Sequence, residues 1–192
     1  MTIYNITHKE DIDGMLSYGI LKTKYPNIAV IPVAHSTIDK DIDLNRFKKG
    51  DIVFITDFCL SNEDMKYLTN TCKVIWIDHH ISTIKRMEEA NIKFYAKKTD
   101  IKILACGLAW QFCYPLIPMP VGVEYCTRYD AWTHNWNMNI IYFNFGIYSL
   151  PNFGIYNQDI WQKIIESDPQ WIRNVTYSPT LKDRSFYSSI PT

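Results

Sequence analysis

The chain lacks the features that mark disulfide-rich, zinc-finger and membrane-spanning proteins. Its five cysteines are odd in number and form no Cys-x-x-Cys pair, which argues against a disulfide framework or a structural zinc site. No apolar run is long enough to cross a bilayer, and the first residues lack the basic and apolar regions of a secretory leader. We therefore expect reduced core thiols in a cytoplasmic protein that does not enter a membrane.

The chain also has no excess of charge and no cluster of glycines. Its 20 basic and 20 acidic residues cancel, which argues against binding of a long nucleic acid duplex through a strong positive field. With 192 residues, 47% of them apolar, the chain is long enough for one substantial core. We expect a single domain over residues 1–175 and a C-terminal tail of little periodicity over residues 176–192.

Short apolar segments alternate with helical segments through the first two-thirds of the chain. This pattern predicts an α/β fold with a mostly parallel five-stranded sheet flanked by helices, followed by a helical C-terminal part. The expected strands are residues 2–7, 28–34, 51–57, 73–78 and 92–95.

Helical spacing of apolar residues predicts helices over residues 14–24, 61–70 and 158–166. Ser61 has the side chain of an N-cap, because its hydroxyl can accept hydrogen bonds from the first amides of the second helix. Beyond Thr99 we expect an apolar helical stripe in the core, interrupted by two prolines, and it consists of Ile103, Leu104, Leu108, Phe112 and Leu116.

The fourth expected strand ends in the triplet Asp78-His79-His80. A carboxylate and two imidazoles are thereby placed at the carboxyl edge of the sheet, where open α/β sheets bind ligands. Two adjacent histidines are weak evidence alone, since side chains alternate across a strand and one of them can be a hydrogen-bonded core residue.

Other strand ends carry the same types of side chain. His8, Asp11 and Asp13 follow the first strand, and Asp57 follows the third. Because parallel strands share one carboxyl edge, these groups should meet the triplet there. Each has a structural alternative, since Asp11 and Asp57 can cap a helix or a turn and Asp13 can belong to a turn. Together, imidazoles and carboxylates favour Mn²⁺ or Mg²⁺.

These motifs, in this order, resemble those of DHH-superfamily phosphoesterases. Residues 8–17, His-Lys-Glu-Asp-Ile-Asp-Gly-Met-Leu-Ser, resemble the first family motif, and Asp57 resembles the second. The triplet is the third motif, and Asp130 in Arg-Tyr-Asp-Ala-Trp resembles the fourth. Asp130 can alternatively pair with Arg128 or a nearby lysine.

The resemblance implies two metal ions, Mn²⁺ or alternatively Mg²⁺, and six ligands: His8, Asp11, Asp13, Asp57, His79 and Asp130. His8 and Asp11 would hold the first ion. Asp13, His79 and Asp130 would hold the second, and Asp57 would bridge both. Of the two implied catalytic residues, Asp78 would orient an imidazole, and His80 would face the scissile phosphate.

The resemblance further implies a metal-dependent phosphodiesterase, close to nano-RNase and exonuclease-like branches, that cleaves short oligonucleotides or cyclic (di)nucleotides. Candidate substrate contacts are His35, Trp132 and His134, with packing or loop roles as alternatives. The glycine-rich, histidine-containing second domain of most members is not found here, which suggests an open site, a homodimer or a partner protein. A pyrophosphatase or polyphosphatase, and a non-catalytic nucleotide-binding module, are the alternative functions.

Overall fold

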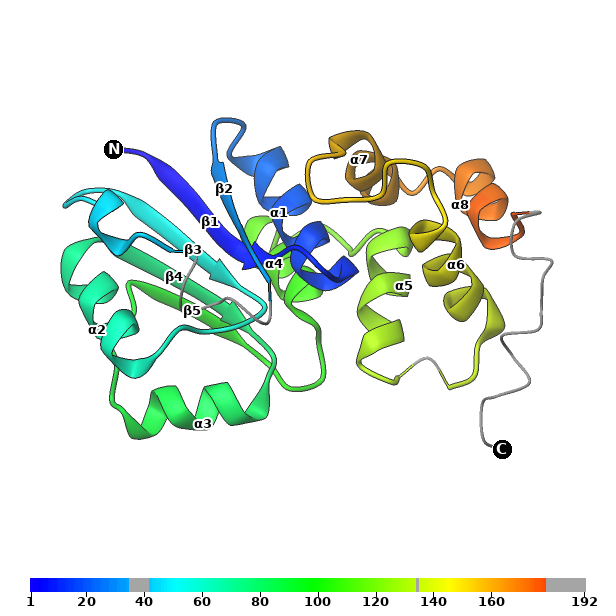
Figure 1. Cartoon of the computed structure of the whole chain (residues 1–192). Helices are drawn as coiled ribbons and strands as arrows, with labels where there is room; N and C mark the ends of the chain where they lie inside the picture. Colours follow the sequence, from blue (N-terminus) through cyan, green and yellow to red (C-terminus); the bar gives the residue numbers. More distant parts are fainter. Residues whose placement is uncertain (35–41, 134, 179–192) are drawn as a thin grey trace.

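The computed structural model describes residues 1–34, 42–133 and 135–178. A five-stranded sheet with the order β2-β1-β3-β4-β5 forms its centre, and every neighbouring pair of strands is parallel (Figure 1). The strands are β1 (Ile3–His8), β2 (Ala29–Val33), β3 (Ile52–Thr56), β4 (Lys73–Asp78) and β5 (Ala96–Thr99). The expected α/β fold with a parallel sheet is confirmed.

Helices cover both faces of the sheet and form the C-terminal part. The first four are α1 (Ile12–Lys24), α2 (Asn62–Thr71), α3 (Ile81–Glu89) and α4 (Ala105–Cys113). The remaining four are α5 (Val121–Asp130), α6 (Met138–Tyr148), α7 (Gln158–Glu166) and α8 (Pro169–Thr176). A short 3₁₀ helix, η1, covers Leu44–Arg46. Figure 1 shows α5, α6, α7 and α8 gathered beside the sheet, as the expected helical C-terminal part.

The alternation of side chains along the strands divides the core into two clusters. In β3, Val53 and Ile55 pack with residues of α2 and α3, whereas Phe54 between them packs with α1 and α4. All three are fully buried. The continuous apolar run of such a strand is typical of a sheet that helices cover on both faces.

The fifth strand lies four residues later than expected, at Ala96–Thr99 instead of residues 92–95. Ile92 and Phe94 of the expected segment pack with residues of α2 and α3, and Phe94 stacks on Trp76 with 5.1 Å between ring centroids. β5 is an edge strand with two lysines, which suits an exposed edge. Because the sequence of β5 is polar, the prediction from apolar residues placed the fifth strand too early.

Two helices lie close to their predicted positions, whereas one residue of the expected apolar stripe lies outside the core. α7 has the expected bounds, and Ser61 caps α2 by accepting a hydrogen bond from the Asp64 amide at 3.1 Å. α4 ends at Cys113, before Pro115, because the backbone preceding a proline disfavours helix. Leu116 therefore lies outside the helix and is 95% exposed, which corrects its expected place in the core.

The last described helix, α8, ends at Thr176. Of the expected tail over residues 176–192, positions 179–192 lie outside the described residues. In the ranges that the structure describes, no helix has both the length and the apolar character needed to cross a membrane.

Candidate metal centre

A cluster of carboxylate and imidazole groups lies at the carboxyl edge of the sheet. Strand order reverses between β1 and β3, and such switch points are where open α/β sheets bind ligands. Asp57 directly follows β3, and His79 and His80 directly follow β4. One ligand atom from each of these three residues lies within 4.8 Å of those of the other two. The triplet and the third strand end therefore meet as predicted.

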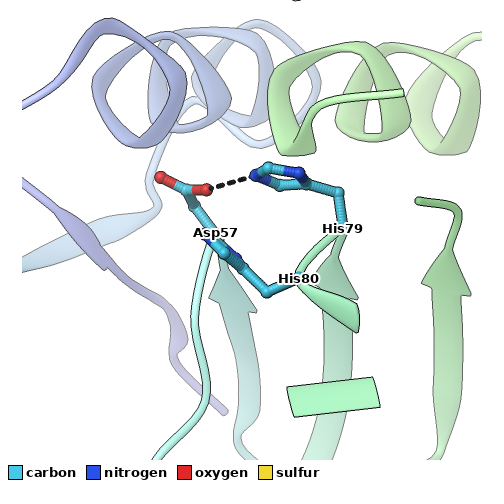
Figure 2. Close-up of side chains that lie close together, drawn as sticks. All are labelled: Asp57, His79 and His80. Atoms are coloured by element: carbon cyan, nitrogen blue, oxygen red, sulfur yellow. Dashed lines mark ion pairs between the residues drawn. The ribbon is translucent and has the colours of Figure 1, made fainter. Parts of the chain in front are cut away.

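Asp57 leaves β3 in a left-handed conformation, with φ at 71°. Its amide donates to the Ile77 carbonyl at 3.0 Å and so extends the contact with β4 by one residue. Aspartate tolerates this conformation better than most residues. Figure 2 shows the Asp57 carboxylate facing the ring of His79.

His79 lies between two buried carboxylates. Its Nε2 is 3.4 Å from Asp57 Oδ1 and 3.5 Å from Asp13 Oδ2. The Asp13 carboxylate also accepts hydrogen bonds from the amides of Ala105 at 3.0 Å and Cys106 at 2.6 Å. Asp13 thus caps the first turn of α4 and presents negative charge to His79 at the same time.

The two buried carboxylates, Asp13 and Asp57, have the electrostatic properties of a cation site. Burial first, and then the negative charges of Asp13 and Asp11, raise the pKa of Asp57 well above its ordinary range. Among the described residues, no lysine or arginine forms an ion pair with Asp13 or Asp57. A divalent cation would remove the repulsion between the two carboxylates, and oxygen with imidazole ligands suits Mn²⁺ or Mg²⁺.

Asp78 is fully buried and orients His80. Its Oδ1 lies 2.7 Å from His80 Nδ1 and accepts from the amides of His79 and His80, and its Oδ2 accepts from the Thr83 hydroxyl at 2.5 Å. Burial alone would raise the pKa of Asp78, but the hydrogen bonds from His80 and Thr83 together hold it below its ordinary value. The same hydrogen bond, which His80 donates to Asp78, raises the pKa of His80.

This arrangement leaves His80 Nε2 as the ring atom available to a ligand. Sequence reasoning anticipated that Asp78 would orient an imidazole, but it missed Thr83, which fixes the second carboxylate oxygen. The available signal was a hydroxyl residue in the first turn of the helix that follows the triplet.

Asp13 lines one small cavity next to this cluster together with two further carboxylates, Asp11 and Asp130. The cavity has a volume of about 70 Å³ and is lined by Asp11, Ile12, Asp13, Leu104, Cys126, Tyr129, Asp130, Asn144 and Tyr148. Asp11 is also the N-cap of α1, where it accepts from the Gly14 amide at 2.8 Å. Although Asp130 is an exposed residue, burial of its carboxyl group first, and then Asp13 and Asp11, raise its pKa.

Tyr148 and Asn144, both from α6, are cavity residues that the sequence did not single out. Desolvation is the largest cause that raises the pKa of Tyr148, to about 12, so its phenol stays protonated near neutral pH. The apolar composition of α6 gave no sign that these two polar side chains face the carboxylates.

His8 ends β1 and is buried, but the structure does not place it in the Asp57, His79 and His80 group. Its ring lies 4.9 Å from that of Phe58, measured between centroids. The chain passes close to it at Gly14, where a Cβ atom would lie 2.6 Å from the His8 carbonyl oxygen. Gly14 is therefore required for the first turn of α1 to approach β1.

Of the expected substrate contacts, Trp132 lies two residues beyond Asp130 and is 79% exposed. His35 and His134 lie outside the described residues. A cavity of about 300 Å³ between α5, α6 and α8 is larger than the one beside Asp13, but histidine, aspartate and glutamate are missing from its described lining. The described side chains that could bind a metal therefore lie at the edge of the sheet and not in this larger cavity.

Comparisons with known proteins bear on the fold alone. No protein-family model matches the chain, and no curated protein matches it. Among solved structures, the chain is similar to an uncharacterized protein from Helicobacter pylori G27, with 16% sequence identity and a TM-score of 0.61. The similarity covers 97% of this chain and 60% of that one, so this chain spans about 60% of its neighbour's length.

Proposed function

We propose that the protein is a metal-dependent phosphodiesterase of the DHH superfamily, acting on short oligonucleotides or cyclic (di)nucleotides. The observation that carries the proposal is the meeting of Asp57, His79 and His80 at the carboxyl edge of a parallel sheet, with Asp13 3.5 Å from His79. The proposed metal is Mn²⁺, in two copies, with Mg²⁺ as the alternative. The proposed ligands are His8, Asp11, Asp13, Asp57, His79 and Asp130.

The side chains of the site suit phosphate chemistry. Bound metal ions would offset phosphate charge and lower the pKa of a coordinated water. Asp57 and Asp13 would hold cations from two sides of His79, while the capped turn of α4 keeps Asp13 in place. His80, with its pKa raised by Asp78, can donate a hydrogen bond or a proton to the leaving oxygen.

The overall charge balance supports a short substrate over a long duplex. We also propose a cytoplasmic location, because all five cysteines are buried and free. A homodimer is proposed as one way to supply a substrate wall beside the open edge.

A substrate panel tests the activity. The purified chain with Mn²⁺ is incubated with di- to pentanucleotides, cyclic mono- and dinucleotides, pyrophosphate and polyphosphate. We expect phosphodiester hydrolysis that Asp57→Asn abolishes and Asp159→Asn, an exposed substitution on α7, leaves unchanged. Failure to hydrolyse any substrate, with bound metal demonstrated, would overturn the proposal. Cleavage of pyrophosphate or polyphosphate alone would favour the phosphoanhydride alternative, and binding without cleavage the non-catalytic module.

A further inference from the structure

The backbone around Asp57 is fixed to the neighbouring strand β4. Asp57 has a left-handed conformation, and its amide donates to the Ile77 carbonyl of β4 at 3.0 Å. The next carbonyl along the chain, that of Phe58, accepts from Nε1 of Trp76, also on β4, at 3.0 Å. These two hydrogen bonds hold the chain on both sides of the Asp57 side chain.

Arg86, on α3, holds the residues that come next. Its Nη2 donates to Cys59 Sγ at 2.7 Å, and its Nη1 donates to the Leu60 carbonyl at 3.0 Å and to Asn62 Oδ1 at 3.3 Å. α3 begins directly after His80, which is its N-cap residue. One guanidinium therefore joins the chain that follows β3 to the helix that follows the triplet.

The Arg86 guanidinium is half-buried, and these three acceptors are neutral. Burial raises the pKa of the Cys59 thiol to about 12, so its sulfur accepts as an uncharged group. Within the described ranges, no aspartate or glutamate forms an ion pair with Arg86. Its contacts thus use the fork of N–H donors that distinguishes arginine from lysine, and they do not neutralise a carboxylate.

The position of Asp57 needs such support because a second carboxylate lies nearby. Asp57 and Asp13 are both buried, and their oxygens approach the same atom, His79 Nε2, at 3.4 and 3.5 Å. Repulsion between two ionised carboxylates favours movement of one away from the other unless a cation lies between them. Bonds that hold the chain after Asp57 oppose this movement. A site held in its binding geometry binds more tightly than one that must first rearrange.

We propose that Arg86 is a positioning residue of the metal centre, which keeps Asp57 beside His79 by holding residues 59–62 against α3. This inference rests on the proposed function, because it takes Asp57 and His79 as metal ligands. The positive charge of Arg86 acts in the opposite direction, since a fixed cation weakens the binding of another cation nearby. Removal of the guanidinium should therefore weaken metal binding if Arg86 positions Asp57, and strengthen it if only its charge matters.

Mn²⁺ binding tests this role without any turnover. Electron paramagnetic resonance detects free Mn²⁺ and so gives its affinity for the wild-type chain and each variant. We expect Arg86→Gln to bind Mn²⁺ about tenfold more weakly, as is usual when a group that orients a metal ligand is removed. Arg86→Lys keeps the charge but not the fork of donors, so its affinity should lie between those of the wild type and Arg86→Gln.

Ser61→Ala is the matched control. Ser61 lies in the same segment, but its hydroxyl caps α2 by accepting from the Asp64 amide. Thermal denaturation in EDTA should show that Ser61→Ala and Arg86→Gln both lower the melting temperature, because each loses hydrogen bonds. Only Arg86→Gln should also weaken Mn²⁺ binding.

Unchanged or tighter Mn²⁺ binding in Arg86→Gln would overturn the inference, and so would wild-type affinity in Arg86→Lys. An equal loss of affinity in Ser61→Ala would also overturn it, because general loosening of the segment would then be sufficient. No Mn²⁺ binding by the wild-type chain would overturn the inference together with the proposed function. Binding that depends on Arg86, without hydrolysis of any phosphodiester, would overturn the proposed activity alone.

Discussion

Asp57 combines a buried carboxylate, a nearby Asp13 and a left-handed backbone. Asn has nearly the same shape and tolerates the same backbone, so Asp57→Asn removes the charge without adding strain. In metal-free buffer near neutral pH we expect Asp57→Asn to raise the melting temperature by about 2–4 °C, which corresponds to about 1 kcal/mol for a chain of this length. Calorimetry in EDTA measures this change.

The dependence of this effect on pH follows from the raised pKa of Asp57. Between the ordinary aspartate pKa, about 4, and the raised value, the folded chain binds more protons than the unfolded chain at this residue. The folding stability that Asp57 contributes is therefore present at acidic pH and lost as pH rises through the raised pKa. Asp57→Asn should reduce this loss of folding stability with rising pH. An unchanged dependence of the melting temperature on pH would contradict the raised pKa of Asp57.

Asp13 is expected to have a structural and an electrostatic role at once. Asp13→Ala removes the cap of α4 and should lower the free energy of unfolding by about 1–2 kcal/mol. Ser61→Ala removes the cap of α2, which makes it a matched control. Urea denaturation should show comparable losses for both variants, while only Asp13→Ala should also weaken the thermal stabilisation by Mn²⁺. Equal stabilisation by Mn²⁺ in both variants would leave Asp13 as a cap alone.

The close pairing of Asp57 with His79 could be predicted because both residues end neighbouring parallel strands. The double role of Asp13 could not, since its two hydrogen-bond donors lie more than 90 positions away at the start of α4. His8 also ends a strand at this edge, but the sequence could not give the direction of its ring, which lies 4.9 Å from that of Phe58 between centroids. Its role as a metal ligand stays a prediction.

At the level of elements, the approach of α1 to β1 depends on Gly14. A Cβ atom there would lie 2.6 Å from the His8 carbonyl oxygen and 2.8 Å from His8 Cβ. Gly14→Ala should lower the free energy of unfolding by about 1–3 kcal/mol and move Asp11 and Asp13 away from the strand ends. Chemical denaturation and Mn²⁺ titration measure the two effects.

Gly154→Ala is the matched control for this prediction, because a Cβ atom there meets nothing within 4 Å. Its effect on the free energy of unfolding should stay within about 0.5 kcal/mol. If Gly14→Ala were equally neutral, the close approach of helix and strand would not be needed to build the site.

The elements that could be predicted are those whose apolar residues recur at a clear strand or helix spacing. β1, β3 and β4 are buried apolar strands, and α7 has one sharply apolar face, so their positions followed from the sequence. α6 is apolar around most of its surface because other helices bury it, and its sequence therefore has no clear helical period. The polar edge strand β5 lacked an apolar signal altogether.

At the scale of the whole molecule, the C-terminal helices complete the site. α5 supplies Asp130, and α6 supplies Tyr148 and Asn144, to the cavity that α1 lines with Asp11 and Asp13. α1 packs directly against α7 at Gly19, where a Cβ atom would lie 2.6 Å from Trp161 Cβ. Metal binding should therefore stabilise both parts of the chain together.

Hydrogen exchange with mass spectrometry tests this coupling. Mn²⁺ at 100 times its dissociation constant should stabilise the native state by about 2.7 kcal/mol. Amides at the end of α5 and the start of α1 should exchange more slowly with Mn²⁺, whereas locally opening amides of α8 should change less because α8 does not line the carboxylate cavity. Slower exchange in α1 without any change in α5 would show that Asp130 does not take part.

Anomalous diffraction at the manganese edge, from crystals soaked in Mn²⁺, tests whether the carboxyl edge of the sheet binds metal. We expect anomalous peaks bounded by Asp57, His79 and Asp13, at the carboxyl ends of β3 and β4 and the start of α1. Crystals of Asp57→Asn should lose these peaks. Manganese found only elsewhere on the molecule, or no peak at this edge of the sheet, would contradict a metal centre at Asp57, His79 and Asp13.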